Sequence, residues 1–415
     1  MTTVHAPDPE PAAVWLQPDT PPHLSTLILM AGLAALNMNI FLPSLPSMAA
    51  FFEADYAVVS LAVSAYLAMT AIMQLFVGPL SDRFGRRPVM LWALVVFLLA
   101  TVGCVLAEDV VTFLAFRLIQ AAVATGMVLS RAVVRDLVGP DQAASKIGYV
   151  TMGMALMPMI GPIIGGWLDD AFGWQASFLF VLAFGLAVGA ICWFDMGETN
   201  HTRSSSVTTQ FRQYPELATS HRFWGYALVA AFASGAFFAF LGGGPWVATE
   251  VLGITATRLG FYFAFIAIGY MLGNFLSGLY AEAVGLNRMM MSGTVFSAAG
   301  MLGGLVLFMV GFVHPITLFG AIFFVGIGNG LSMPAAMAGM VSVRPQLAGS
   351  ASGLGGAVMI GGGAALAALT GALLRPEWGA YPLLLMMLLS SALSIGAAMF
   401  VLSVARRRAR EAAEA

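Results

Sequence analysis

The sequence predicts an all-α, polytopic membrane protein, with twelve transmembrane helices in two six-helix halves. Three observations lead to this prediction: the composition, the lengths of the apolar runs and the placement of the arginines. Of the 415 residues, 60% are hydrophobic and 9% are charged, and the mean hydropathy is +0.89. Because soluble domains carry roughly 25% charged residues, this composition excludes an ordinary soluble fold.

Apolar runs long enough to cross a bilayer recur along the whole chain, since a core of about 30 Å needs roughly 20 residues. They lie at approximately 24–44, 57–79, 88–107, 110–131, 146–168, 173–195, 222–243, 257–281, 288–311, 315–338, 351–374 and 380–403. Backbone polar groups in lipid must be satisfied internally, which leaves helices or closed barrels. The runs are too long and too continuous for barrel strands, so each is predicted to be a helix.

The Lys and Arg residues predict the orientation, because they are enriched in cytoplasmic loops. With the N-terminus inside, fifteen of the eighteen fall in cytoplasmic loops or the C-terminal tail. Arg258 and Arg375 fall outside, and Arg117 falls within a helix. Both termini are therefore expected to be cytoplasmic.

A polar, Ser/Thr-rich loop divides the predicted helices six and six. In chain order we expect a disordered cytoplasmic tail 1–23, an N-terminal half 24–196, a cytoplasmic linker 197–221, a C-terminal half 222–404 and a basic cytoplasmic tail 405–415. An internal repeat supports this division, since a glycine–acid–glycine pattern between helices 2 and 3 returns 200 residues later between helices 8 and 9. Its members are Gly78, Asp82 and Gly85, then Gly278, Glu282 and Gly285. Two parallel six-helix repeats with a midplane site between them are a transporter architecture.

The loop between helices 2 and 3, residues 78–88, reads Gly-Pro-Leu-Ser-Asp-Arg-Phe-Gly-Arg-Arg-Pro. Gly78 would allow close approach of a neighbouring helix, Asp82 would place an anion at a helix end, and Gly85 would permit the turn. The loop is thus a candidate conformational element. The alternative is that its arginines only set the topology.

Arg117 in helix 4 is a candidate functional residue, because a charge inside a membrane helix costs several kcal/mol (about 3 on insertion scales). Gln120 follows one turn later on nearly the same face, so the pair could line a polar cavity. Alternatively, Arg117 extends to the outer interface, near Glu108 and Asp109.

Helix 5 combines prolines with small residues at four-residue spacing, in Pro158, Gly161, Pro162 and Gly165. Prolines bend helices, and small residues permit tight packing between helices. The helix is therefore either a conformational element or merely a close-packed one.

Several of these stretches, in the same order along the chain, resemble the major facilitator superfamily. Within it, the chain is similar to the twelve-helix drug:proton antiporters, and specifically to the bicyclomycin and chloramphenicol exporter subfamily. The matching stretches are 42–46 (Leu-Pro-Ser-Leu-Pro), 64–68 (Ser-Ala-Tyr-Leu-Ala), 78–87, 117–121 (Arg-Leu-Ile-Gln-Ala), 131–136 (Arg-Ala-Val-Val-Arg-Asp) and 161–166 (Gly-Pro-Ile-Ile-Gly-Gly). The resemblance covers nearly all of residues 24–403.

This resemblance implies secondary active efflux of drug-like or small amphipathic molecules across the bacterial inner (plasma) membrane, by alternating access and normally against proton entry. It implies that Asp82 faces the start of helix 11, near residues 350–352, and that Arg86 pairs with Asp136. It also implies a role for Arg117 in proton coupling, and a bend in helix 5 that seals the pathway to the outside.

Helix 1 departs from the family, because Asn39 stands where the relatives typically carry a membrane-embedded aspartate. Asparagine cannot titrate, and no acid of this chain falls clearly at the middle of a predicted helix. Coupling then relies on Glu250, Asp82 or Asp136, or it is lost. Asn37 and Asn39 are costly in an apolar helix unless they are partnered. They are expected to line a cavity or to pack between helices.

Polar and methionine side chains in apolar helices complete the predicted sites. The substrate-binding set is Asn37, Asn39, Tyr66, Arg117, Gln120, Met154, Asn274 and Asn329. The conformational set is Gly78, Asp82, Gly85, Arg86, Asp136, Pro158, Gly161, Pro162 and Gly165. Methionine suits varied ligands because it is flexible and polarisable. The scarcity of charge in the membrane favours neutral or weakly charged substrates.

The sequence shows no nucleophile–base pair, metal-ligand cluster or phosphate-binding loop, so we expect no enzyme, no metal and no cofactor, with a proton gradient as the energy source. Cys104 and Cys192 lie in apolar runs and are expected to be buried thiols. The expected partners of this monomer are a small-molecule substrate, protons and lipid, but no nucleic acid. Three alternatives remain: an exporter of an amino acid, sugar or siderophore, an uncoupled facilitator, and a receptor that uses a transporter fold.

Overall fold

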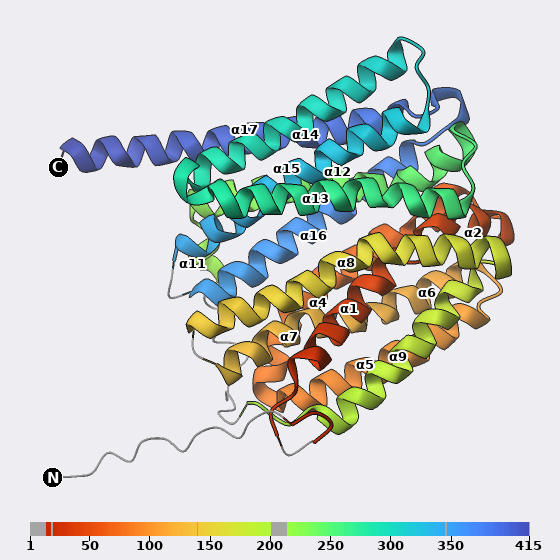
Figure 1. The fold of residues 1–415 in the computed structure, drawn as a ribbon, viewed down its shortest axis with the longest axis horizontal. Helices are drawn as coiled ribbons and strands as arrows, with labels where there is room; N and C mark the ends of the chain where they lie inside the picture. The colour runs from red at the N-terminus through yellow and green to blue at the C-terminus, as the bar shows by residue number, and fades with distance from the viewer. Residues whose placement is uncertain (1–13, 18–19, 139, 201–213, 345–346, 415) are drawn as a thin grey trace.

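The computed structural model describes residues 14–17, 20–138, 140–200, 214–344 and 347–414, and within them all regular structure is helical (Figure 1). The helices are α1 (Leu24–Asn39), α2 (Leu45–Phe51), α3 (Tyr56–Val59), α4 (Leu61–Phe84), α5 (Arg86–Leu106), α6 (Val110–Gln120), α7 (Ala124–Leu137), α8 (Pro140–Phe172), α9 (Gln175–Asp195), α11 (Tyr214–Ala218), α12 (His221–Trp246), α13 (Ala256–Val284), α14 (Leu286–Met309), α15 (Pro315–Ser342), α16 (Ala348–Leu373) and α17 (Tyr381–Glu414). Short 3₁₀ turns occur at Leu42–Ser44, Ala121–Val123 and Pro376–Trp378, and a π-helical turn occurs at Val247–Val251.

Eleven stretches of the described residues are long and apolar enough to cross a membrane. The remaining predicted run, 146–168, lies inside α8, which extends over 33 residues. The predicted helix 4 comprises two helices, α6 and α7, because a 3₁₀ turn interrupts it directly after Gln120. A tightened turn within a long helix often marks a hinge or a strained site.

The helices form two groups that pack against each other along two seams. In the first group α1 packs on α7, α8 and α9, and α5 packs on α6 and α9. In the second group α12 packs on α15, α16 and α17, and α14 packs on α15 and α17. The groups meet where α8 lies against α13 and where α4 lies against α16 (Figure 1).

The two loops of the predicted repeat share one backbone geometry. Gly85 between α4 and α5 has a φ of 101°, and Gly285 between α13 and α14 has a φ of 86°. In each loop the glycine N–H donates to the carbonyl oxygen four residues back, Ser81 or Ala281, at 3.0 Å. A positive φ is the region that favours glycine, so the turn role expected for Gly85 agrees with the structure.

The helix bundle has two ends. The Arg86 end contains the loop between α4 and α5, and the Tyr56 end contains α3. The chain enters α1 at the Arg86 end, where the His23 N–H donates to Asp195 Oδ2 at 2.9 Å beside the end of α9. It also leaves by the Arg86 end, because Leu402 of α17 lines the same pocket as Gly285. Figure 1 shows α17 projecting beyond the other helices on this side.

Three stretches differ from the sequence-based expectation. Within the expected disordered tail, the Leu16 N–H donates to Asp195 Oδ1 at 2.7 Å, so a carboxylate at the end of α9 holds this part of the chain. The expected linker contains α11. The helix predicted to end near residue 403 continues to Glu414, since residues 405–414 are nearly all strong helix formers without Gly or Pro. Residues 1–13, 18–19 and 201–213 lie outside the described part.

Small residues let α8 approach both neighbouring helices closely. An ideal Cβ on Gly165 would overlap the carbonyl oxygen of Ile40, directly after α1, and one on Gly166 would overlap that of Ala256 in α13. The tight packing expected of helix 5 is therefore present. At Gly78, however, the expected close approach is absent, because an ideal Cβ there would meet no heavy atom within 4 Å. Gly78 faces open space in this arrangement of the helices.

Replacing Gly165 with alanine should lower the melting temperature, because the added methyl group would overlap the Ile40 carbonyl oxygen and force α1 and α8 apart. Overpacking of this kind costs about 1–3 kcal/mol. Gly303→Ala in α14 is the matched control, since its Cβ would meet nothing within 4 Å and alanine favours a helix. Thermal unfolding of both purified variants in detergent measures the difference. Equal melting temperatures would contradict the close approach of α1 and α8.

Candidate functional site

The candidate functional site is built around Arg117, which α6 carries into the interior of the first helix group. α6 begins at a capped N-terminus, where Asp109 Oδ1 accepts from the N–H groups of Val111 and Thr112 at 3.0 and 2.9 Å. Hydrogen bonds from Thr112 and Val111 hold the pKa of the Asp109 carboxyl below its usual range. Two turns later, Arg117 is only 1% exposed.

Four of the five N–H groups of the Arg117 guanidinium donate to neutral oxygen atoms. Nε donates to the carbonyl oxygen of Ala62 at 3.2 Å, from α4. Nη2 donates to the carbonyl oxygen of Asn37 at 3.0 Å, and Nη1 to Asn37 Oδ1 at 3.2 Å, both from α1. Nη1 also donates to Gln120 Oε1 through a short hydrogen bond. A single side chain thus links three helices.

Two aromatic rings lie over the Arg117 guanidinium. The Arg117 Cζ lies 4.0 Å from the ring centroid of Tyr66 and 4.3 Å from that of Phe41. A cation over an aromatic face is attracted by the ring quadrupole, and the attraction is stronger where water is excluded. The two rings therefore contribute to holding the charge in an apolar interior.

The partners of Arg117 are held in turn by further hydrogen bonds. Gln120 Nε2 donates to Thr101 Oγ1 at 2.8 Å, which adds α5 to the network. Asn37 Nδ2 donates to the Tyr66 hydroxyl at 3.2 Å and thereby joins α1 to α4. The sequence separations range from 3 to 80 residues. All these side chains belong to the first helix group.

Among the described residues, no carboxylate forms an ion pair with Arg117, and the acceptors of its hydrogen bonds are neutral oxygens. The extension to the outer interface considered above does not occur, since the guanidinium points into the helix group. Asn39 is also fully buried, and its Nδ2 donates back to the Ala35 carbonyl oxygen at 2.7 Å. The substrate-binding role predicted for these residues stays a prediction, and in this structure they lie within packed protein.

Met154, Asn274 and Asn329, also predicted to bind substrate, lie on helices further from Arg117. Met154 in α8 is half-buried and lies near Arg131 of α7, with Nη2 4.0 Å from its sulfur. Asn274 in α13 is half-buried and donates to the Tyr270 carbonyl oxygen at 2.9 Å. Asn329 in α15 is buried, and its Oδ1 accepts no hydrogen bond from the described residues.

Arg131 is a charged residue that the sequence analysis placed with the cytoplasmic arginines. The structure places it within α7, half-buried, and its Nε is shielded from solvent without a hydrogen-bond partner among the described residues. Tyr270 of α13 lies within electrostatic reach. Arg131 thus faces the seam between the two groups, which its sequence position did not reveal.

A second charged network lies at the Arg86 end. Arg86 Nε pairs with Asp136 Oδ2 at 2.9 Å, as the family resemblance implied, and Nη1 pairs with Asp82 Oδ1 at 2.6 Å. Nη1 also donates to Ser81 Oγ at 2.5 Å. These partners of Arg86 come from α4 and α7, so the pairs lie within the first group. α16 packs along α4, but a contact between Asp82 and the start of α16 stays a prediction.

Glu198 is a member of this network that the sequence reasoning missed. Its carboxylate accepts from the backbone N–H of Arg86 at 2.8 Å and of Arg87 at 3.3 Å, at the N-terminus of α5. A helix N-terminus attracts a negative charge, because its first N–H groups are unpaired and the helix dipole is positive there. Asn200 adds a hydrogen bond to the Asp82 carbonyl oxygen at 3.0 Å. No local sequence pattern connects Glu198 with a loop 112 residues earlier.

Three hydrogen bonds join the two helix groups at the Tyr56 end. The Tyr56 hydroxyl donates to the carbonyl oxygen of Gly242 at 3.1 Å. The Thr257 N–H donates to Asp170 Oδ2 at 3.0 Å, and its hydroxyl donates to the Gly166 carbonyl oxygen at 3.3 Å. This end of the bundle is therefore closed by direct contacts between α8 and α13 and between α3 and α12.

The fold and these networks define a polytopic helical membrane protein made of two packed groups of helices. A sequence model of the Major Facilitator Superfamily matches residues 27–368. The bicyclomycin resistance protein homolog of Haemophilus influenzae is 29% identical over 353 residues, 83% of this chain and 87% of that protein. Multidrug resistance protein D of Escherichia coli is 28% identical over 370 residues, 87% of this chain and 91% of that protein.

Among solved structures, a bacterial homolog of the human lysosomal transporter Spinster matches with a TM-score of 0.72 and 18% identity, over 92% of this chain and 96% of that chain. The chain belongs to the Major Facilitator Superfamily. It is accordingly a transporter rather than an enzyme, needs no cofactor and spans the bacterial inner membrane several times.

Replacing Arg117 with leucine should destabilise the protein by about 2–4 kcal/mol, because the buried oxygens of Asn37, Gln120 and Ala62 lose their donor. Lysine should restore little of this loss, since one ammonium cannot reproduce the planar fork of donors. Arg258→Lys is the matched control, because Arg258 is exposed at the start of α13. Thermal unfolding of the purified variants measures the effect, and an unchanged melting temperature for Arg117→Leu would refute the structural role of the network.

Proposed function

We propose that the protein exports drug-like or small amphipathic molecules across the inner membrane by alternating access, as a monomer. The three hydrogen bonds across the seams at the Tyr56 end carry this proposal, because an exporter must open and close such an end in each cycle. The names of the Haemophilus and Escherichia relatives, which refer to bicyclomycin and multidrug resistance, support the substrate class.

The two units that move would be the predicted halves, 24–196 and 222–404. Rocking of two repeats about a central site is a common mechanism in secondary transporters. Because the partners of Arg117 all lie in the first group, such a motion would leave the buried charge covered. The seams, in contrast, consist of close glycine contacts and a few hydrogen bonds.

The substrate would bind at the seam near Arg131 and Met154, opposite Asn274. Arg131 offers a positive charge there that forms no ion pair with the described residues, and methionine offers an adaptable surface. This charge favours neutral or weakly charged substrates with electron-rich groups over permanent dications, which would want a buried carboxylate. The Arg117 network would then position α1, α4 and α6 and contact the substrate less directly.

Proton-coupled antiport is the expected energy source, although Asn39 cannot carry a proton. The carboxylates left for this role are Asp82 and Asp136, which pair with Arg86, and Glu250, which is exposed in the π-helical turn. Uncoupled facilitated diffusion is the second candidate, and the buried, non-titratable Asn39 favours it.

Transport into inverted membrane vesicles with an imposed pH gradient distinguishes coupled antiport from facilitation. Antiport predicts that accumulation of a panel drug, chloramphenicol for example, rises with the gradient and collapses with a protonophore. Asn39→Asp should add a titratable group to α1 and shift the pH dependence of transport, and Asn39→Gln is the control without charge. Accumulation that ignores the gradient in the native protein would rule out antiport and favour facilitation.

Cross-linking the Tyr56 end tests alternating access. Asp170→Cys and Thr257→Cys place two thiols where the Asp170 carboxylate and the Thr257 N–H lie 3.0 Å apart, and the native Cys104 and Cys192 are buried. A short bifunctional thiol reagent should stop transport in the double variant, because it would hold this end closed. Each single variant is the control. Full transport after complete cross-linking would contradict an opening of this end.

An exporter of an amino acid, sugar or siderophore would share the same fold and motion. Competition between these metabolites and drugs during uptake into the vesicles distinguishes a metabolite exporter from a drug exporter. Drug transport that excess metabolite leaves unchanged supports drug efflux.

A further inference from the structure

The two repeat loops have the same backbone but different surroundings. At the first loop, the Glu198 carboxylate occupies the N-terminus of α5, 2.8 Å from the Arg86 nitrogen. An ideal Cβ on Gly85 would overlap Glu198 Oε2. The chain reaches this position because it turns back across the loop after α9 ends at Asp195. The first loop thus holds an anion supplied by the protein itself.

At the second loop the same position is open. Among the described residues, no heavy atom lies within 4 Å of an ideal Cβ on Gly285, and α14 begins without a side-chain cap. The chain does not turn back here, because α17 continues as a helix to Glu414. Residue 398, which corresponds to Glu198 at the 200-residue spacing of the repeat, is a buried alanine.

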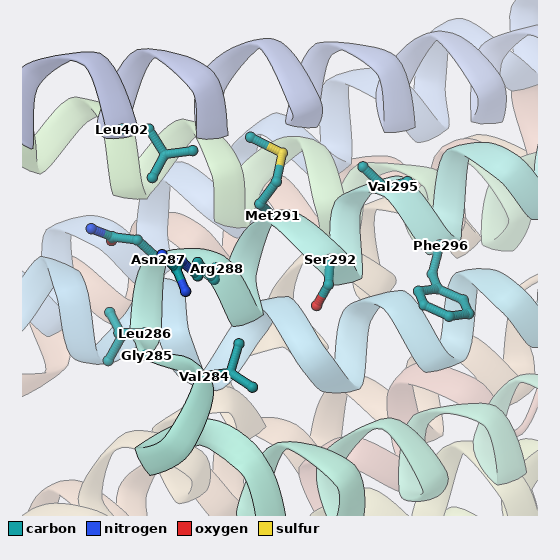
Figure 2. A pocket seen from close by; sticks show the side chains of 10 residues that line it. All are labelled: Val284, Gly285, Leu286, Asn287, Arg288, Met291, Ser292, Val295, Phe296 and Leu402. Atoms are coloured by element: carbon teal, nitrogen blue, oxygen red, sulfur yellow. The ribbon is translucent and has the colours of Figure 1, made fainter. Parts of the chain in front are cut away.

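A pocket of about 790 Å³ opens at this position, between α14 and α17 (Figure 2). Its polar end is formed by Asn287 and Arg288 at the start of α14. The Asn287 side chain is oriented by the Tyr226 hydroxyl, which donates to its Oδ1 at 3.0 Å. Arg288 is exposed and forms no ion pair with the described residues. The polar end therefore combines a helix N-terminus with an available positive charge.

Apart from the hydroxyl of Ser292, the rest of the pocket is apolar and follows α14. Figure 2 shows Met291, Val295 and Phe296 following one another along α14, with Leu402 of α17 to the left of Met291. From residue 286 to residue 296 the helix rises about 15 Å, at about 1.5 Å per residue. That length is about half of a bilayer core of about 30 Å. The candidate membrane span begins at Leu286, so a pocket that follows α14 from this residue to Phe296 would cover about the thickness of one leaflet.

We propose that this pocket binds an anionic phospholipid of the inner membrane. The phosphate would lie at the N-terminus of α14 beside Arg288, in the place that corresponds to the Glu198 carboxylate, and an acyl chain would lie along Val295 and Phe296. Helix N-termini bind phosphate groups, and basic pockets between membrane helices bind anionic headgroups. The apolar part favours a lipid over a soluble phosphate, which would leave that surface unused.

Native mass spectrometry of the purified full chain, titrated with phosphatidylglycerol, tests the proposal directly. Arg288→Gln should weaken the binding of phosphatidylglycerol about fivefold, the effect of one Arg at a bilayer surface. Phosphatidylcholine, whose headgroup has no net charge, should bind more weakly and respond little to the variant. Arg258→Gln is the matched control, because Arg258 is exposed at the Tyr56 end of α13. It should leave the affinity for phosphatidylglycerol unchanged.

Val295→Trp provides a second variant, which fills the apolar part of the pocket and leaves Arg288 in place. It should lower the affinity for phosphatidylglycerol but not for glycerol 3-phosphate. Equal affinities of Arg288→Gln and Arg258→Gln for phosphatidylglycerol would overturn the proposal. Displacement of the lipid by an equal concentration of glycerol 3-phosphate would also overturn it, because the site would then be one for soluble anions. These measurements require no transport, so their outcome is independent of the efflux proposal.

Discussion

A charge buried among membrane helices must find its hydrogen-bond partners within the protein, and Arg117 imposes this requirement on the first helix group. Its donors reach oxygens of Ala62, Asn37 and Gln120, and two aromatic rings cover the cation. Because these hydrogen bonds come from α1, α4 and α6, a displacement of any of the three helices would leave part of the buried guanidinium without acceptors. The Arg117 network thus ties α1, α4 and α6 of the first group together.

The seams between the two groups contain no comparable network around a buried charge among the described residues. There, backbone approaches backbone at glycines such as Gly166, and a few hydrogen bonds close the Tyr56 end. No partner of Arg117 crosses these seams. The groups can therefore separate at one end without uncovering the charge of Arg117, which agrees with the proposed alternating access. The contacts that the proposed motion would break are these hydrogen bonds and glycine contacts of the seams, and not the hydrogen bonds of Arg117.

The two repeat loops have the same backbone geometry but different groups at the N-terminus of the helix that follows. Gly85 and Gly285 have nearly the same φ and the same hydrogen bond. In the first copy, Glu198 meets the N-terminus of α5. In the second copy, an alanine stands in the corresponding place and α17 runs straight on, so the N-terminus of α14 is left to face the membrane surface. A lipid phosphate would supply there the charge that Glu198 supplies in the first copy.

The sequence by itself determined the helices, the membrane location and the importance of Arg117, because apolar length and a lone charge in lipid are local, costly features. The resemblance to the family supplied the Arg86–Asp136 pair. Only the tertiary structure decided that Arg117 points inward to Asn37, that Arg131 faces a seam and that Glu198 caps α5. These contacts join residues up to 112 positions apart or depend on which face of a helix meets a neighbour, and local sequence patterns carry neither kind of information.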